Sequence, residues 1–281
     1  MRLLPALLIA LASLGSGVAN AATLDRIKET GTMTLGYRTD AMPFSYDNTI
    51  GEPAGYSVEL CRVIAAEIKA ELKLDKLDVR YVPVPAEGKF DELQAGKVDL
   101  ICGASTMTLS RREQVDFSLP TFVTGATLLY RKDGPKSFEE LKGQKVGVRA
   151  GTTTETALRA VLDAHQFDAQ LVPVPSHEEG LKQLAAGNLA AYFGDGAILL
   201  YQWRSSPDRE KLMISTRFFS NELYGLPLPK GDAAFHLAVD RALAGLYGSG
   251  RILDLFHATF GNEVDPSDLV KALYMLNSLP E

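Results

Sequence analysis

The feature that most constrains the fold is a β-α-β pattern that occurs twice. The first copy starts at Val-Pro-Val-Pro in 82–85, continues through a helix that ends at 93–96 and a strand, and reaches Gly103. The second copy starts at 172–175 and reaches Gly194, so the offset is 90 residues at the start and 91 at the end. Two copies are too few for a solenoid. The repeat therefore predicts two lobes built on the same plan.

The segments around the repeat alternate between strand and helix patterns. Strands are predicted at 32–37, 77–84 and 98–101, and a helix at 56–72 has apolar residues at helical spacing. This alternation predicts an α/β fold with a mainly parallel sheet in each lobe. Ligands bind at the carboxyl ends of strands in such sheets. The repeat places Ala104 and Asp195 at two such ends, which predicts a cleft between the lobes.

Two segments are predicted to cross between the lobes. The stretch 117–130 is long, apolar and rich in β-forming residues, and 222–228 can return to the first lobe before three C-terminal helices. We therefore expect the first lobe to comprise residues 22–125 and 224–281 and the second lobe residues 126–223. Two crossings predict a two-segment hinge.

The N-terminus has the three parts of a secretory signal peptide. A positive start is followed by an apolar run and by Ala19-Asn20-Ala21, a small-x-small cleavage site. We expect residues 1–21 to be removed by cleavage after Ala21, and the mature chain to be exported. The 281-residue chain has a formal net charge of −6 and no basic run, which argues against nucleic acid or an anionic membrane as a partner.

Two cysteines, Cys61 and Cys102, remain in the exported chain. Export permits a disulfide, which would stabilise the fold by about 4 kcal/mol on the chain-entropy model. Two buried free thiols are the alternative.

The stretch 102–120 follows a strand with small residues, hydroxyls and two adjacent arginines. Small residues allow a ligand to approach backbone N–H groups, and an Arg guanidinium matches a carboxylate bidentately. An ordinary strand-to-helix loop with solvated arginines is the alternative. The stretch 151–155, Gly-Thr-Thr-Thr-Glu, is either a second anion site or only a helix cap.

With these features together, the chain resembles periplasmic amino-acid-binding proteins of ABC importers, solute-binding protein family 3. The motifs that carry the resemblance are Thr108-x-x-Arg111 with Asp-Phe-Ser-Leu-Pro at 116–120, and Gly-Thr-Thr-x-Glu at 151–155. The resemblance covers nearly all of the mature chain and is strongest to the glutamate/aspartate-binding branch. It implies a two-lobe fold in which hinge closure traps one amino acid.

The resemblance also implies roles for individual residues. Arg111 would bind the α-carboxylate with help from Thr106 and Thr153, and Asp195 would accept the α-ammonium together with the backbone at Ala104. A zwitterion needs such a pair because each desolvated charge must be matched.

For an acidic ligand side chain the resemblance implies contacts from Arg38 and His177. The chain departs from the branch at Ala86, Lys89 and Ala104, where the branch has Ser, Arg and Ser. Lys89 keeps the positive charge but lacks the planar fork of Arg. From residue type alone, Arg38 and Lys89 could be surface charges and His177 a helix-start residue.

The implied function is capture of a polar, acidic amino acid by a monomeric periplasmic protein and its delivery to membrane permease subunits. No cofactor, metal or catalytic residue is expected. A different polar amino acid or a small dicarboxylate is the alternative ligand. The alternative functions are a sensor subunit and an enzyme like cyclohexadienyl dehydratase, for which Glu178 and Glu179 are near the site in sequence.

Overall fold

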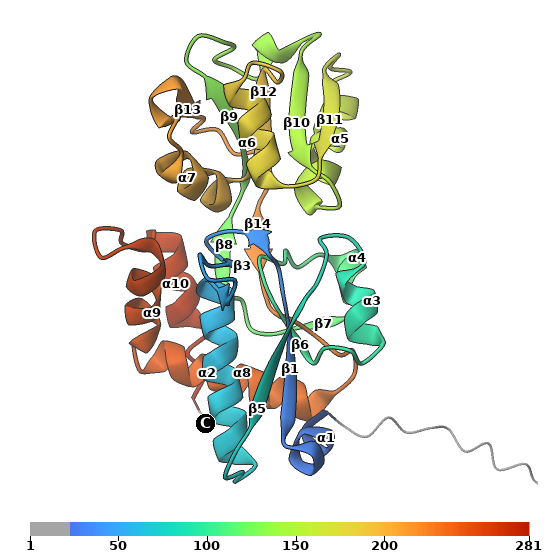
Figure 1. Ribbon diagram of the computed structural model, residues 1–281, viewed down its shortest axis with the longest axis vertical. Coiled ribbons are helices and arrows are strands. Elements are labelled where there is room, and N and C mark those ends of the chain that lie inside the picture. The colour runs from blue at the N-terminus through green and yellow to red at the C-terminus, as the bar shows by residue number, and fades with distance from the viewer. Residues whose placement is uncertain (1–22, 281) are drawn as a thin grey trace, which may run out of the picture.

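The computed structural model describes residues 23–280, so the predicted signal peptide, residues 1–21, lies outside the described residues. Figure 1 shows two lobes joined by a narrow waist. Each lobe combines a sheet with helices, and the predicted α/β two-lobe class is confirmed. Within 23–280 no helix is both long and apolar enough to cross a membrane.

The first lobe is built on a three-stranded parallel sheet of order β5-β1-β6. The predicted strands and the predicted helix at 56–72 are confirmed, with ends that differ by one or two residues. The elements of this lobe are α1 (Thr23–Thr30), β1 (Thr32–Tyr37), β2 (Asp40–Ala41), β3 (Ser45–Asp47), β4 (Pro53–Ala54), α2 (Tyr56–Glu71), β5 (Asp78–Pro83), α3 (Lys89–Gln94), β6 (Leu100–Cys102), α4 (Leu109–Arg112), β7 (Asp116–Phe117), β15 (Pro227–Leu228), α8 (Ala233–Gly248), α9 (Arg251–Phe260) and α10 (Asp268–Leu276).

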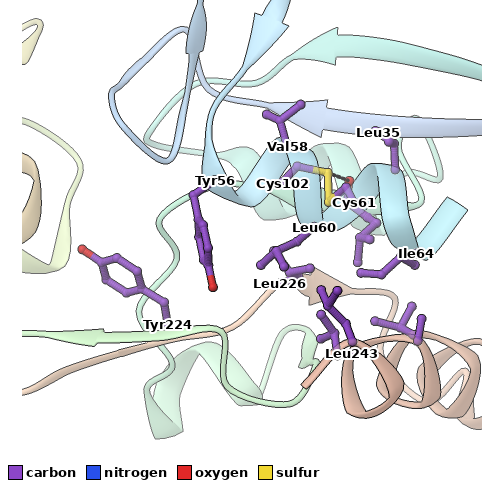
Figure 2. Close-up of a cluster of buried hydrophobic side chains, with 14 of the residues drawn as sticks. Leu35, Tyr56, Val58, Leu60, Cys61, Ile64, Cys102, Tyr224, Leu226 and Leu243 are labelled. Atoms are coloured by element: carbon purple, nitrogen blue, oxygen red, sulfur yellow. Dashed lines mark hydrogen bonds between the residues drawn. A yellow bond between two sulfur atoms is a disulfide. The ribbon is translucent and has the colours of Figure 1, made fainter. Parts of the chain in front are cut away.

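A disulfide joins Cys61 in α2 to Cys102 in β6, as one of the two alternatives predicted. The two Cα atoms lie 6.1 Å apart, and both residues are fully buried. Figure 2 shows the bridge among Leu60, Ile64 and Leu226 of the largest hydrophobic core. The helical spacing of the apolar residues in α2 directs one face of this helix onto that core. The disulfide therefore attaches α2 to the strand that leads into the predicted ligand-binding stretch.

The second lobe is built on a five-stranded sheet of order β11-β10-β12-β9-β13. Its first three strands are parallel, as predicted, whereas β9 and β13 pair antiparallel with their neighbours. The strand β9 enters directly from the waist, with no crossover helix before it, and so runs against β12. The elements of this lobe are β9 (Ala126–Arg131), η1 (Glu139–Leu141), β10 (Lys145–Arg149), α5 (Thr153–Ala164), β11 (Gln170–Val174), α6 (His177–Ala185), β12 (Ala191–Asp195), α7 (Gly196–Ser205), η2 (Arg209–Lys211) and β13 (Leu212–Ile214).

The chain passes through the waist twice, in β8 (Phe122–Thr124) and β14 (Glu222–Tyr224). The two strands pair antiparallel, with Glu222 opposite Thr124. The predicted lobe boundary at 125/126 falls just after β8, and the boundary at 223/224 falls within β14. Both boundaries stay a prediction of where the lobes divide.

Candidate ligand-binding site

Residues of the candidate site follow the carboxyl ends of parallel strands in both lobes. Arg38 comes directly after β1, and Ala104 and Thr106 come after β6. In the second lobe Asp195 ends β12 and Arg149 ends β10. The lobes face one another at these ends, which is where open α/β sheets bind ligands.

Arg111 lies in the short helix α4, which fixes its backbone. The hydroxyl of Thr108 caps the start of α4 and accepts a hydrogen bond from the backbone N–H of Arg111 at 3.1 Å. The guanidinium donates from Nη1 to the backbone carbonyl of Thr106 at 2.8 Å and lies 5.5 Å from the centre of the Phe90 ring. Arg111 is half-buried, whereas the adjacent Arg112 is exposed. Of the two arginines, only the first is partly buried.

Asp195 places a carboxylate near that guanidinium. Asp195 is 8% exposed, and its Oδ1 atom has no hydrogen-bond partner among the described residues. Burial and the neighbouring Glu222 carboxylate together raise the pKa of Asp195 to about 7, although the Tyr224 hydroxyl and the charges of Arg111 and Lys89 act to lower it. A buried acceptor without a partner is costly. Asp195 is therefore suited to accept a cationic donor from a ligand.

Hydroxyl groups connect the two lobes next to Arg111 and Asp195. The Thr106 hydroxyl oxygen of the first lobe and the Thr153 hydroxyl oxygen of the second lobe lie 3.2 Å apart. The Thr153 hydroxyl also donates to Oε2 of Glu222 at 3.3 Å, and Ser220 donates to Oε1 of the same carboxylate at 2.7 Å. Glu222 is 3% exposed. A buried carboxylate on the crossing strand β14 thus orients a predicted ligand contact of the second lobe.

Lys89 is buried, although from residue type alone it could have been a surface charge. Its Nζ donates to the Ser105 hydroxyl at 2.9 Å and lies 5.4 Å from the centre of the Phe90 ring. Burial lowers the pKa of Lys89 well below its ordinary value, and the nearby cations Arg111 and Arg38 lower it further. A ligand carboxylate at this point would favour the charged form.

Arg38 is buried as well and forms part of a charged cluster with residues of the second lobe. Its Nη2 donates to Oδ1 of Asp40, while Nε of Arg149 donates to Oδ2 of the same carboxylate at 2.7 Å. His177, at the start of α6, is 4% exposed, and its Nδ1 lies 2.9 Å from the Tyr192 hydroxyl. Burial lowers the pKa of His177 to about 4, so the imidazole is neutral at neutral pH.

Four residues in the hydrogen-bond networks of the predicted site residues were not predicted from the sequence: Asp40, Ser105, Arg149 and Glu222. Ser105 lies inside the predicted stretch 102–120, and Asp40 lies two residues after Arg38. Arg149 is at the carboxyl end of β10, and such a strand end is itself a signal for a site. No sequence motif indicates Glu222. Its contact with Thr153 arises from the path of β14 between the lobes.

The other residues named in the sequence analysis pack in the core, are exposed to solvent or bond within their own helix. Ala104 packs against the core of the first lobe, and Ala86 is buried. Glu178 is exposed, and Glu179 accepts a hydrogen bond from Gln183 within α6. In the part of the chain that the structure describes, no group of three or more His, Cys, Asp or Glu side chains could hold a metal ion.

A guanidinium on the first lobe and a buried carboxylate on the second lobe match the two charged ends of an amino acid. The family model of bacterial extracellular solute-binding proteins, family 3, matches residues 33–262. The chain belongs to this family.

Curated relatives agree over most of the chain. An L-glutamate/L-aspartate-binding protein of Pseudomonas aeruginosa is 36% identical over 249 residues, which cover 88% of this chain and 82% of the relative. A glutamate/aspartate import solute-binding protein of Escherichia coli K12 is 30% identical over 274 residues, 94% of this chain and 91% of the relative. Both are named as binding proteins.

Among solved structures, the chain is similar to an ancestral amino acid-binding protein, AncCDT-1, described as a precursor of cyclohexadienyl dehydratase. The TM-score is 0.74 at 29% identity, with 85% of this chain and 99% of that chain covered. The scaffold is therefore one on which both binding proteins and an enzyme lineage are based.

Proposed function

We propose that the protein captures an acidic amino acid, glutamate or aspartate, between its lobes in the periplasm and delivers it to an ABC importer. The observation that carries the proposal is the proximity of Arg111 to the buried carboxylate of Asp195, whose Oδ1 atom has no hydrogen-bond partner among the described residues. Arg111 binds the α-carboxylate together with Thr106 and Thr153. Asp195 accepts the α-ammonium, aided by the backbone carbonyl of the turn at Ala104.

The side-chain end of the ligand faces a cationic region. Arg38 and Lys89 are buried there, and the neutral imidazole of His177 can donate one hydrogen bond. When all of its ionisable groups are charged, the site holds four cations and three carboxylates. The cations are Arg38, Lys89, Arg111 and Arg149, and the carboxylates are Asp40, Asp195 and Glu222. A ligand with a net charge of −1 balances this excess, which favours an acidic side chain over a neutral one.

Three further statements belong to the proposal. The chain is exported and cleaved after Ala21, acts as a monomer, and closes by bending at β8 and β14 before it docks on permease subunits. The support comes from the family membership, from the paired strands at the waist and from the names of the relatives. Pull-down of the membrane partner tests delivery, since a permease supports it and a sensor kinase contradicts it.

Isothermal titration of the mature protein with the proteinogenic amino acids and small dicarboxylates tests the ligand. We expect glutamate or aspartate to bind in the micromolar range, which corresponds to about −8 kcal/mol. Binding of no member of the panel would refute the proposal. Binding of neutral amino acids alone would refute the acidic specificity while leaving amino-acid capture intact.

We propose binding rather than catalysis. The support is that Glu178 is exposed and Glu179 is hydrogen bonded within its own helix, so neither is placed as an acid in the cleft. Incubation with prephenate and arogenate checks this statement, and turnover of either compound would contradict it.

A further inference from the structure

An ion pair between the lobes lies beside Arg38, at the proposed side-chain end of the site. Asp40, in β2 of the first lobe, bonds through Oδ2 to Nε of Arg149, at the end of β10 in the second lobe, at 2.7 Å. The Asp40 side chain is 20% exposed and that of Arg149 is 14% exposed. Arg149 also donates from Nη1 to the carbonyl of Ala150 at 2.9 Å, which restricts its guanidinium. The pair is thus better shielded from solvent than an ordinary surface salt bridge.

The same carboxylate carries a second guanidinium. Oδ1 of Asp40 accepts from Nη2 of Arg38, whose side chain is only 7% exposed. Burial by itself raises the pKa of Asp40, but Arg38, Arg149 and the nearby His177 outweigh this effect and lower it below its usual value. The carboxylate therefore stays ionised. Because two guanidinium groups repel each other, they can lie together here only with an anion between them.

The lobes approach closely beside this pair. Gly151, two residues after Arg149, has φ of +70°, and a Cβ atom there would lie 2.8 Å from Cβ of Glu87 in the first lobe. On the outer side, Asp40 lines an inter-lobe groove of about 580 Å³ with residues that include Tyr46 of the first lobe and Tyr201 of the second. Asp40 thus stands at the boundary between the buried Arg38 and this groove.

We propose that Asp40 is a positioning residue that joins Arg38 of the first lobe to Arg149 of the second lobe and assembles the side-chain end of the site when the lobes meet. A guanidinium has five donors, so Arg38 retains donors for a ligand carboxylate while it is bonded to Asp40. The bridge from Arg38 through Asp40 to Arg149 does not require a ligand. Its effect on ligand selectivity rests on the proposed function.

The experiment uses Asp40→Asn, which removes the charge and keeps the shape, Arg149→Gln from the other lobe, and the double variant. Asp47→Asn is the matched control, because Asp47 lies in the same hairpin and lines the same groove but bonds to Tyr37 within the first lobe. Circular dichroism verifies that each variant is folded, and two variants from separate lobes guard against a failure of one to fold.

Small-angle X-ray scattering without added ligand is the first measurement. We expect a larger radius of gyration for Asp40→Asn and for Arg149→Gln than for the wild type, and no change for Asp47→Asn. This measurement is independent of the ligand. If the wild type bound no acidic amino acid, the proposed function would fail while this expectation could still hold. An unchanged radius in both folded variants would overturn the inference.

Titration with glutamate and glutamine is the second measurement. We expect Asp40→Asn to weaken glutamate binding about tenfold or more and glutamine binding less, because a desolvated charge pair is broken at the side-chain end. The double variant should match the Asp40→Asn variant within about twofold, as coupled residues do. Equal losses for the two ligands, or losses that multiply in the double variant, would overturn the positioning role.

Discussion

Ligand affinity is expected to fall as the solution is acidified from about pH 8 to about pH 5.5. Asp195 must be ionised to hold an ammonium group, and burial raises the pKa of this carboxyl to about 7. At pH 5.5 only about one molecule in 30 carries the carboxylate, so affinity should be about 30-fold weaker, a loss of about 2 kcal/mol.

Isothermal titration with glutamate at a series of pH values measures this effect. Asp195→Asn should bind weakly and show little dependence on pH in this range. His177→Gln should bind less tightly but keep the pH dependence, because the pKa of His177 is already lowered to about 4 by burial. An imidazole with an ordinary pKa near 6.5 would produce a similar midpoint, and this variant separates the two origins.

The stability of the ligand-free protein should change in the opposite direction. The pKa of Asp195 is higher in the folded than in the unfolded state, so its ionisation opposes folding, and this contribution disappears as the pH falls from 7 toward 4. Asp195→Asn should therefore raise the free energy of unfolding at neutral pH, by up to about 4 kcal/mol. A pH dependence of affinity that persists in Asp195→Asn, or one that vanishes in His177→Gln, would refute the reasoning.

Two other predictions follow from the site and the core. Arg111→Lys should weaken ligand binding about tenfold or more, because an ammonium group cannot replace the bidentate guanidinium. Replacement of the exposed Arg112 by Lys should leave the affinity within about twofold of the wild type. Equal effects of the two substitutions in titration would show that Arg111 is not the arginine that binds the ligand. Replacing Cys61 and Cys102 together by Ala should lower the free energy of unfolding by about 4 kcal/mol, measured in urea. Reduction of the wild type should cause a similar loss, and an unchanged urea midpoint in both cases would contradict the stabilising role of the bridge.

Local sequence patterns were sufficient for most of the fold. The apolar spacing in 56–72 placed α2, and the repeat placed the strand ends that carry Ala104 and Asp195. The antiparallel pairing of β9 and β13 was not predicted, since the strand pattern does not state the direction in which a strand enters a sheet. The choice between a disulfide and two thiols also depended on the distance between α2 and β6.

The sequence by itself determined the parts of the site that depend on neighbouring residues. The Thr108 cap that presents Arg111 is such a part, because capping acts over three residues. Only the tertiary structure decided the bridge from Arg38 through Asp40 to Arg149 and the contact of Glu222 with Thr153. The Asp40–Arg149 bond joins positions 109 residues apart in lobes that fold around separate cores, and the Thr153–Glu222 bond joins positions 69 residues apart, so no local pattern reports either bond. The Asp40–Arg149 bond depends in addition on how the two lobes meet.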